Sequence, residues 1–188
     1  MSVEGSPGLF LHVASELLRS LPQLSLRFVM VGGGVLLEPI KELAQALGID
    51  HAVKFRGHVD HERVGRELEA MDVYLAPRLG ETFGMALVEA LSHGLPVVGC
   101  SCGAYSEIVS NGTSGLILPC HEGGKEDGNG VVLTLAGALR RLLLDPSERR
   151  TLGIVARERA KLRFGVLRYV ELYSSFYGSL WLRHGLGG

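Results

Sequence analysis

The stretch "GETFGMALVEALSHGLPVV", residues 80–98, decides the fold because it joins a helix directly to a strand. Residues 85–93 are rich in helix-forming residues, so we predict a helix there. Gly94 and Pro96 end it, since glycine favours the position after a helix and proline cannot continue one. The apolar run "LPVVGC" that follows is typical of a buried strand.

The same alternation extends along the whole chain. Apolar spacing predicts a first helix at 9–21, and "LSLRFVMVGGG" predicts a strand that runs into three glycines. Further strands are expected at 52–57, 72–77, 95–100 and 116–119, and further helices at 36–47, 61–71, 131–144, 146–164 and 166–181. Strands that alternate with helices indicate a parallel sheet. We therefore predict an α/β fold: a Rossmann-like parallel sheet with helices on both faces.

Length and composition fit one domain. The 188 residues are enough for a single domain over 1–188, with closing helices over about 131–183. Apolar residues make up 46% and charged residues 21%, as in ordinary soluble proteins. No apolar run approaches the ~20 residues of a membrane span. The first residues lack the features of a signal peptide, so we expect a cytoplasmic location.

Charge and cysteine usage exclude two classes of partner. The net charge of −1 gives no general attraction to nucleic acid. The three cysteines, Cys100, Cys102 and Cys120, follow no metal-ligand spacing. We therefore expect reduced cysteines, no metal site and no nucleic-acid partner.

In such sheets ligands bind beyond the carboxyl ends of the strands. The first of these ends carries Gly32 to Gly34, where backbone amides could approach a phosphate beside a helix N-terminus. The spacing does not complete a dinucleotide-binding fingerprint, because Leu36 and Leu37 occupy the later positions. A tight turn that only packs explains the same glycines equally well.

The loop that leads into the helix at 85–93 gives a more specific indication. If Thr82 is the N-cap, the amides of Phe83, Gly84 and Met85 have no partner within the helix and form an anion site. Gly84 would let a ligand approach closely. A pyrophosphate suits such a site.

Two carboxylates flank this predicted anion site. Glu81 precedes the helix and Glu89 lies about two turns along it, which separates their backbones by roughly 10–12 Å. A nucleotide sugar has a hexose and a ribose on either side of a diphosphate, so one glutamate could accept hydrogen bonds from each diol. Alternatively, Glu81 is a favourable charge at a helix start and Glu89 an exposed residue. The apolar neighbours of Glu89 predict a mostly buried helix and favour the first interpretation.

These residues carry a resemblance to a known family. "APRLGETFGMALVEALSHGLPVV" resembles the glutamate, seven residues, glutamate motif of retaining glycosyltransferases with the GT-B fold, especially family four (group 1). The segments "LRFVMVGGG", "VKFRGHVDHERVGRELEAMDVYLAP", "GAYSEIVSNGTSGLIL" and "LLLDPSERRTLGIVARERA" follow the order and spacing of that family. The resemblance covers about residues 5–175.

The resemblance implies transfer of a sugar from a nucleoside diphosphate donor with retention of configuration and without a metal. Glu81 matches the glutamate that faces the donor sugar and is the implied catalytic residue, while Glu89 matches the one that holds the ribose. Residues 82–85 match backbone that contacts sugar and phosphates. Arg56, with Gly57 beside it, matches a position whose backbone meets the base.

The sequence departs from the family near its start. The family places an arginine and a lysine in a pattern near "GR…KG"; Gly5 can match the last glycine, but Glu4 then stands where lysine is expected. The acceptor-binding N-terminal domain has no counterpart in this sequence. The resemblance therefore implies the donor-binding, C-terminal half of an enzyme, weak or inactive alone, whose helix at 166–181 meets the missing domain or a dimer partner.

Two other functions remain open at this point. The same fold could serve as a non-catalytic module that binds a nucleotide or a protein. A dinucleotide-dependent oxidoreductase is less favoured, because its glycine fingerprint is incomplete and the two glutamates would have no role. The base of the donor, the sugar and the acceptor are not specified by these motifs.

Overall fold

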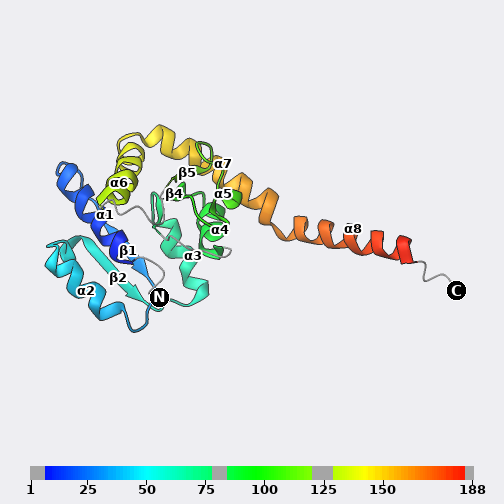
Figure 1. Cartoon of the computed structure of the whole chain (residues 1–188), viewed down its shortest axis with the longest axis horizontal. Helices are drawn as coiled ribbons and strands as arrows, with labels where there is room; N and C mark the ends of the chain where they lie inside the picture. Colours follow the sequence, from blue (N-terminus) through cyan, green and yellow to red (C-terminus); the bar gives the residue numbers. More distant parts are fainter. Residues whose placement is uncertain (1–6, 78–83, 120–128, 185–188) are drawn as a thin grey trace.

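Helices and parallel strands alternate in the computed structural model, which describes residues 7–77, 84–119 and 129–184 (Figure 1). The helices are α1 Pro7–Ser20, α2 Leu37–Ala46, the short 3-10 helix η1 Asp50–Ala52, α3 His61–Glu69, α4 Met85–Ser92, α5 Tyr105–Ile108, α6 Asn129–Leu144, α7 Pro146–Phe164 and α8 Val166–His184. The strands are β1 Phe28–Val31, β2 Val53–Gly57, β3 Tyr74–Ala76, β4 Val97–Cys100 and β5 Gly115–Leu118. The α/β fold predicted from the sequence is confirmed.

The strands form two parallel sheets, in contrast to the single sheet expected. β1 pairs with β2, and β3, β4 and β5 pair in that order. All residues of the central strand β4 are buried, whereas β1 and β3 each have only one buried residue. Within the described ranges, no strand joins β1 to β3.

Helix α1 connects the two sheets through its side chains. Val13 and Leu17, with Leu21 directly after the helix, pack with β4, β5 and α6 in one hydrophobic cluster. Leu11 and Ala14 pack with β1, β2 and α2 in another. All five side chains are at most 1% exposed. Burial of apolar surface, rather than a continuous backbone ladder, therefore holds the halves together.

Helix α4 packs very closely against α7. Ala90, Ala156 and Ala160 are buried where the two helices meet. A Cβ atom added to Gly153 would lie 2.3 Å from the carbonyl oxygen of Gly94, a distance that real side chains do not tolerate. Small residues on both sides thus bring the helix backbones together and fix the position of α4.

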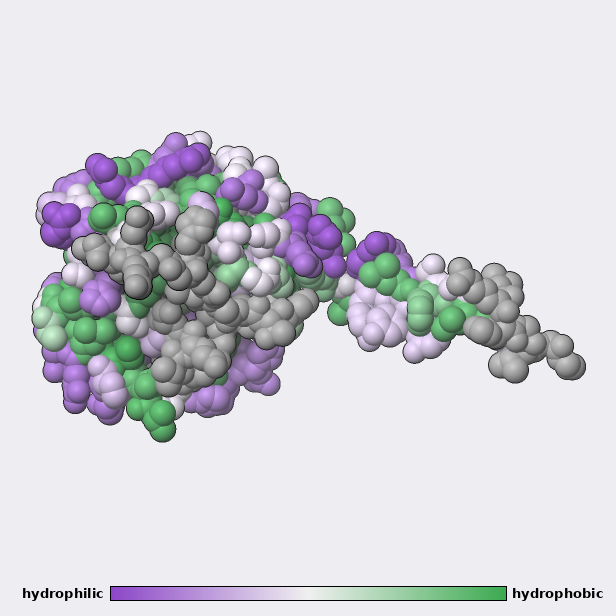
Figure 2. All heavy atoms as spheres, in the orientation of Figure 1, coloured by the Kyte–Doolittle hydropathy of each residue, from purple (hydrophilic) through white to green (hydrophobic). Residues whose placement is uncertain are grey.

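The last helix, α8, extends away from the rest of the molecule (Figure 1). Gly165 separates it from α7 with an extended backbone, φ −70° and ψ 151°. Its large apolar and aromatic side chains are exposed, and Figure 2 shows apolar and pale side chains along this projection. They are Val166, Leu167, Tyr169, Val170, Leu172, Tyr173, Phe176, Tyr177 and Trp181.

The sequence-based expectations about the cysteines and about membrane spans have different outcomes. The structure holds Cys100 in a disulfide, so the expectation of reduced cysteines is wrong for that residue, whereas Cys102 keeps a thiol. Among the described helices, none is long and apolar enough to cross a bilayer. The cytoplasmic location stays a prediction.

Gly153→Ala should destabilise the protein by about 1–3 kcal/mol, because the new methyl group overpacks the contact with Gly94. Thermal unfolding followed by circular dichroism would measure the loss. Gly137→Ala in α6 is the matched control, since nothing lies within 4 Å of the added atom. That control should keep or raise stability, by up to about 1 kcal/mol. Equal melting temperatures for the two variants would contradict the close packing of α4 on α7.

Removal of α8 after Phe164 should leave the unfolding temperature within a few degrees of the full chain's. The large apolar and aromatic side chains of α8 are about half exposed or more, so little burial is lost. The same truncation should raise solubility, because it removes a large exposed apolar surface. Thermal unfolding and sedimentation of both proteins would test this. A drop of 10 °C or more would show that α8 stabilises the body of the protein.

Candidate functional site

Two glycine backbones meet at the carboxyl ends of β1 and β2. The Gly32 amide donates a hydrogen bond to the Gly57 carbonyl oxygen at 2.8 Å, just beyond a register irregularity at Met30 and Val31. Gly32 has φ 138° and Gly57 has φ 65°, conformations that favour glycine. No side chain projects from either residue, so this edge exposes backbone to a ligand.

The loop after β2 packs against the glycine loop. A Cβ atom added to Gly33 would lie 3.3 Å from the backbone nitrogen of His58, a tight contact. Gly34, with φ 123°, accepts a hydrogen bond from the Leu37 amide where α2 begins. The predicted phosphate-binding glycines thus lie at the start of α2, next to the end of β2.

The side chain of Arg56 is already engaged. Its Nε donates to Glu67 of α3 at 2.9 Å, and the same two groups make a second contact of 2.8 Å. This bidentate ion pair ties β2 to α3. Arg56 therefore offers a ligand its backbone rather than its charge.

Helix α4 begins at Met85, where the sequence predicted it, but with a different N-cap. Its N-cap is Gly84 in the left-handed conformation, φ 87° and ψ 52°, so the expectation of Thr82 as N-cap is wrong. The carbonyl oxygen of Gly84 accepts from Leu87 at 2.9 Å. The amides of Met85 and Ala86 are consequently left without a partner inside the helix. The Met85 side chain is 61% exposed.

Glu89 lies on the second turn of α4 and is half-buried, with its side chain 30% exposed. The prediction of a mostly buried helix is therefore only partly correct. Leu87, Ala90 and Leu91 face the core, while Met85 at the N-terminal end is exposed. The carboxylate contacts one imidazole: Oε1 lies 3.8 Å from Nδ1 of His61.

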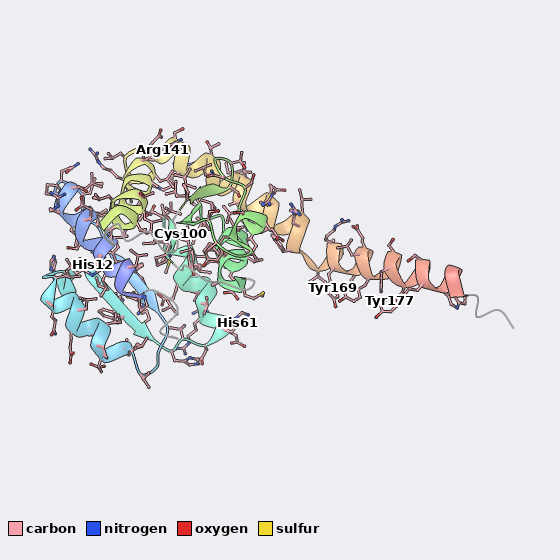
Figure 3. The ribbon with its side chains drawn as sticks, viewed as in Figure 1. His12, His61, Cys100, Arg141, Tyr169 and Tyr177 are labelled. Carbon is pink, nitrogen blue, oxygen red and sulfur yellow. The ribbon has the colours of Figure 1, made fainter. Side chains whose placement is uncertain are left out.

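His61 is a site residue that the sequence did not reveal. It is the first residue of α3, and its side chain is 86% exposed (Figure 3). The histidines of this sequence form no nucleophile or metal-ligand pattern, so His61 does not stand out as a site residue. Only its position, four residues after the end of β2 and so near the ligand-binding edge, could have indicated it.

The structure brings together only part of the predicted site. Gly32, Gly34, Arg56 and Gly57 meet at the ends of β1 and β2, and Gly84, Met85 and Glu89 lie on or next to the first turns of α4. The remaining predicted residues, Glu81, Thr82 and Phe83, lie outside the described residues. Glu81 as the catalytic residue therefore stays a prediction.

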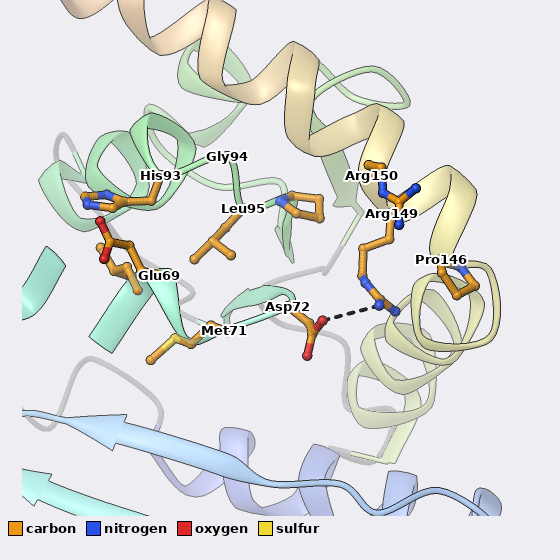
Figure 4. Close-up of a pocket in the computed structure, with 11 residues that line it drawn as sticks. Glu69, Met71, Asp72, His93, Gly94, Leu95, Pro146, Arg149 and Arg150 are labelled. Carbon is orange, nitrogen blue, oxygen red and sulfur yellow. Dashed lines mark ion pairs between the residues drawn. The ribbon is translucent and has the colours of Figure 1, made fainter. Parts of the chain in front are cut away.

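A cavity of about 270 Å³ lies at the opposite, amino-terminal ends of β3 and β4 (Figure 4). Asp72 and Arg149 form an ion pair of 3.2 Å across it. Its other lining residues are Leu68, Glu69, Met71, His93, Gly94, Leu95, Pro96, Pro146 and Arg150. None of the predicted site residues lines it, and parallel sheets bind ligands at the other edge. The cavity is therefore distinct from the candidate site.

Metal-binding groups are not gathered in the described part of the chain. No three His, Cys, Asp or Glu side chains come together there in a way that could hold an ion. Function without a metal stays a prediction.

Comparisons with known proteins match both sequence and fold. The sequence matches the family described as glycosyl transferases group 1 over residues 5–145. The D-inositol 3-phosphate glycosyltransferase of Nocardia farcinica is 33% identical over 186 residues. That alignment covers 96% of this chain and 39% of the relative, so the chain spans about two fifths of the relative's length.

Solved structures show the same fold. The pneumococcal O-GlcNAc transferase GtfA, in complex with UDP and GlcNAc, has a TM-score of 0.81 at 17% identity, covering 95% of this chain and 34% of that one. The C-terminal domain of LpcC, a glycosyl transferase group 1 family protein of Francisella tularensis, has a TM-score of 0.72 at 19% identity. That alignment covers 88% of this chain and 83% of the LpcC domain. Because the family model matches residues 5–145, most of the chain's length, the chain belongs to the glycosyl transferases group 1 family.

Proposed function

We propose that this chain binds the nucleoside diphosphate sugar donor of a glycosyltransferase that moves a hexose with retention of configuration. The observation that carries the proposal is the half-buried carboxylate of Glu89, five residues after the left-handed Gly84 at the start of α4. At this boundary between core and solvent, its carboxylate can accept hydrogen bonds from a ligand. The hydroxyl groups of a ribose supply them.

The diphosphate binds at the start of α4 in this proposal. The amides of Met85 and Ala86 have no partner inside the helix, and the helix dipole favours negative charge at this end. Gly84 has no side chain to keep a phosphate away. The ribose then reaches Glu89, and the base lies against the backbone of Arg56 and Gly57.

Glu81 faces the donor sugar in this arrangement. Its assignment rests on the spacing of the motif, in which a glutamate precedes the helix that carries Glu89. The sugar and the ribose lie on either side of the diphosphate, so one carboxylate serves each. The donor chemistry needs no metal in this proposal.

UDP is the first nucleotide to test. The pneumococcal transferase that shares this fold was solved with UDP and GlcNAc. The shared fold by itself does not assign a base, so GDP and ADP remain the alternatives.

The acceptor is bound by another part of the longer protein. The chain spans 39% of its Nocardia relative, and we infer that the remainder holds the acceptor and closes over the donor. The apolar side of α8 gives this remainder, or a second copy of the chain, a surface to cover. The isolated chain is then a donor-binding unit with weak or no transferase activity, and it works in the cytoplasm.

Glu89→Ala should weaken nucleotide binding by about 10- to 100-fold, the effect of losing charge-assisted hydrogen bonds. Titration calorimetry of the purified chain with UDP, GDP and ADP would measure it. The nucleotide affinity of Glu89→Gln should lie between that of the unaltered chain and that of Glu89→Ala, because the amide keeps one acceptor and loses the charge.

Glu69→Ala serves as the control for this experiment. Glu69 lines the separate cavity at the other end of the sheet, so its loss should leave nucleotide affinity unchanged. A larger effect from Glu69→Ala than from Glu89→Ala would place the nucleotide in that cavity instead. Absence of binding by all three nucleotides would favour a non-catalytic module with this fold.

A further inference from the structure

The Glu89 carboxylate has one polar contact in the part of the chain that the structure describes. Its Oε1 atom faces Nδ1 of His61 at 3.8 Å, across the space between α4 and α3. This separation is too long for a hydrogen bond, which needs about 2.7–3.2 Å. A carboxylate that accepts from ribose must be turned toward the sugar, and no other described side chain fixes its rotation.

His61 has no packing role that would explain its position. Its side chain is 86% exposed, whereas α3 packs into the core through Val64 and Leu68. The exposed imidazole has room to move the roughly 1 Å that would bring Nδ1 into hydrogen-bond range of Oε1. The contact is thus available to the carboxylate without any change in the fold.

Arg56, the neighbouring cation, is not available to hold the Glu89 carboxylate. Arg56 is held by Glu67 through two contacts of 2.8 and 2.9 Å. His61 follows the same strand by four residues and is the side chain of this segment that faces Glu89. Among the described residues, the donor that meets the carboxylate therefore comes from α3.

We propose that His61 is a positioning residue that sets the selectivity of the site for ribose over 2′-deoxyribose. It holds Oε1 of Glu89, which directs Oε2 toward the 2′-hydroxyl group of the nucleotide. That hydroxyl can then donate to the oriented carboxylate, whereas the 3′-hydroxyl does not depend on this orientation. This role rests on the proposed function, because it requires Glu89 to bind the ribose.

The experiment compares affinities for a ribonucleotide and its deoxy counterpart. Calorimetry first identifies which of UDP, GDP and ADP the unaltered chain binds best, and the 2′-deoxy form of that nucleotide is titrated next. We expect the ribonucleotide to bind about tenfold more tightly, the effect of one charge-assisted hydrogen bond. In His61→Ala the ratio should fall to about two, with little change in affinity for the deoxynucleotide.

A conservative variant separates positioning from general support of the fold. In His61→Asn the side-chain nitrogen lies at the same number of bonds from Cα as Nδ1 and can donate to Oε1. This variant should restore most of the tenfold ratio. His51→Ala is the control, because His51 is an exposed histidine at the opposite end of β2 and should leave the ratio unchanged.

Different results overturn different parts of the proposal. If Glu89→Ala weakens binding but His61→Ala keeps the tenfold ratio, the role of His61 is wrong and that of Glu89 stands. Equal loss of affinity for both nucleotides, or failure of His61→Asn to restore the ratio, also overturns the positioning role. If the unaltered chain binds none of the three nucleotides, the proposed function fails and the role of His61 fails with it.

Discussion

The close contact between α4 and α7 is the constraint on which the candidate site depends. Gly94 and Gly153 let the two backbones approach, and the buried Leu87 and Leu91 fix the inner side of α4. With that side committed to the core, Glu89, two residues from each leucine, lies on the other side of α4. There its carboxylate is half-buried and lies 3.8 Å from His61 at the start of α3.

The rest of the site consists largely of backbone. Gly32 contacts Gly57 at the end of the sheet, and α4 begins at the left-handed Gly84. Backbone amides are held by the fold and lose little freedom when a ligand binds. Such a site suits a diphosphate, whose charge is met by oriented dipoles, and leaves the recognition of hydroxyl groups to a few side chains.

The sequence predicted most of the fold because helix and strand periodicity, with glycine and proline at the ends, is local information. It failed at the N-cap of α4 and at the contact made by Glu89. Thr82 is a better N-cap by residue preference than Gly84, yet the left-handed backbone at Gly84 starts the helix. The contact of Glu89 with His61 joins residues 28 positions apart and follows no sequence pattern.

The division of the strands into two sheets has a consequence for how the molecule opens. Backbone ladders transmit cooperativity within a sheet, and none joins β1 to β3 in the described ranges. The β1–β2 unit and the β3–β4–β5 unit can therefore lose structure separately, because it is packed side chains, including those of α1 and Phe28 of β1, that link them. A nucleotide held between Gly57 and Glu89 would bridge both units, so that each could open only with the other.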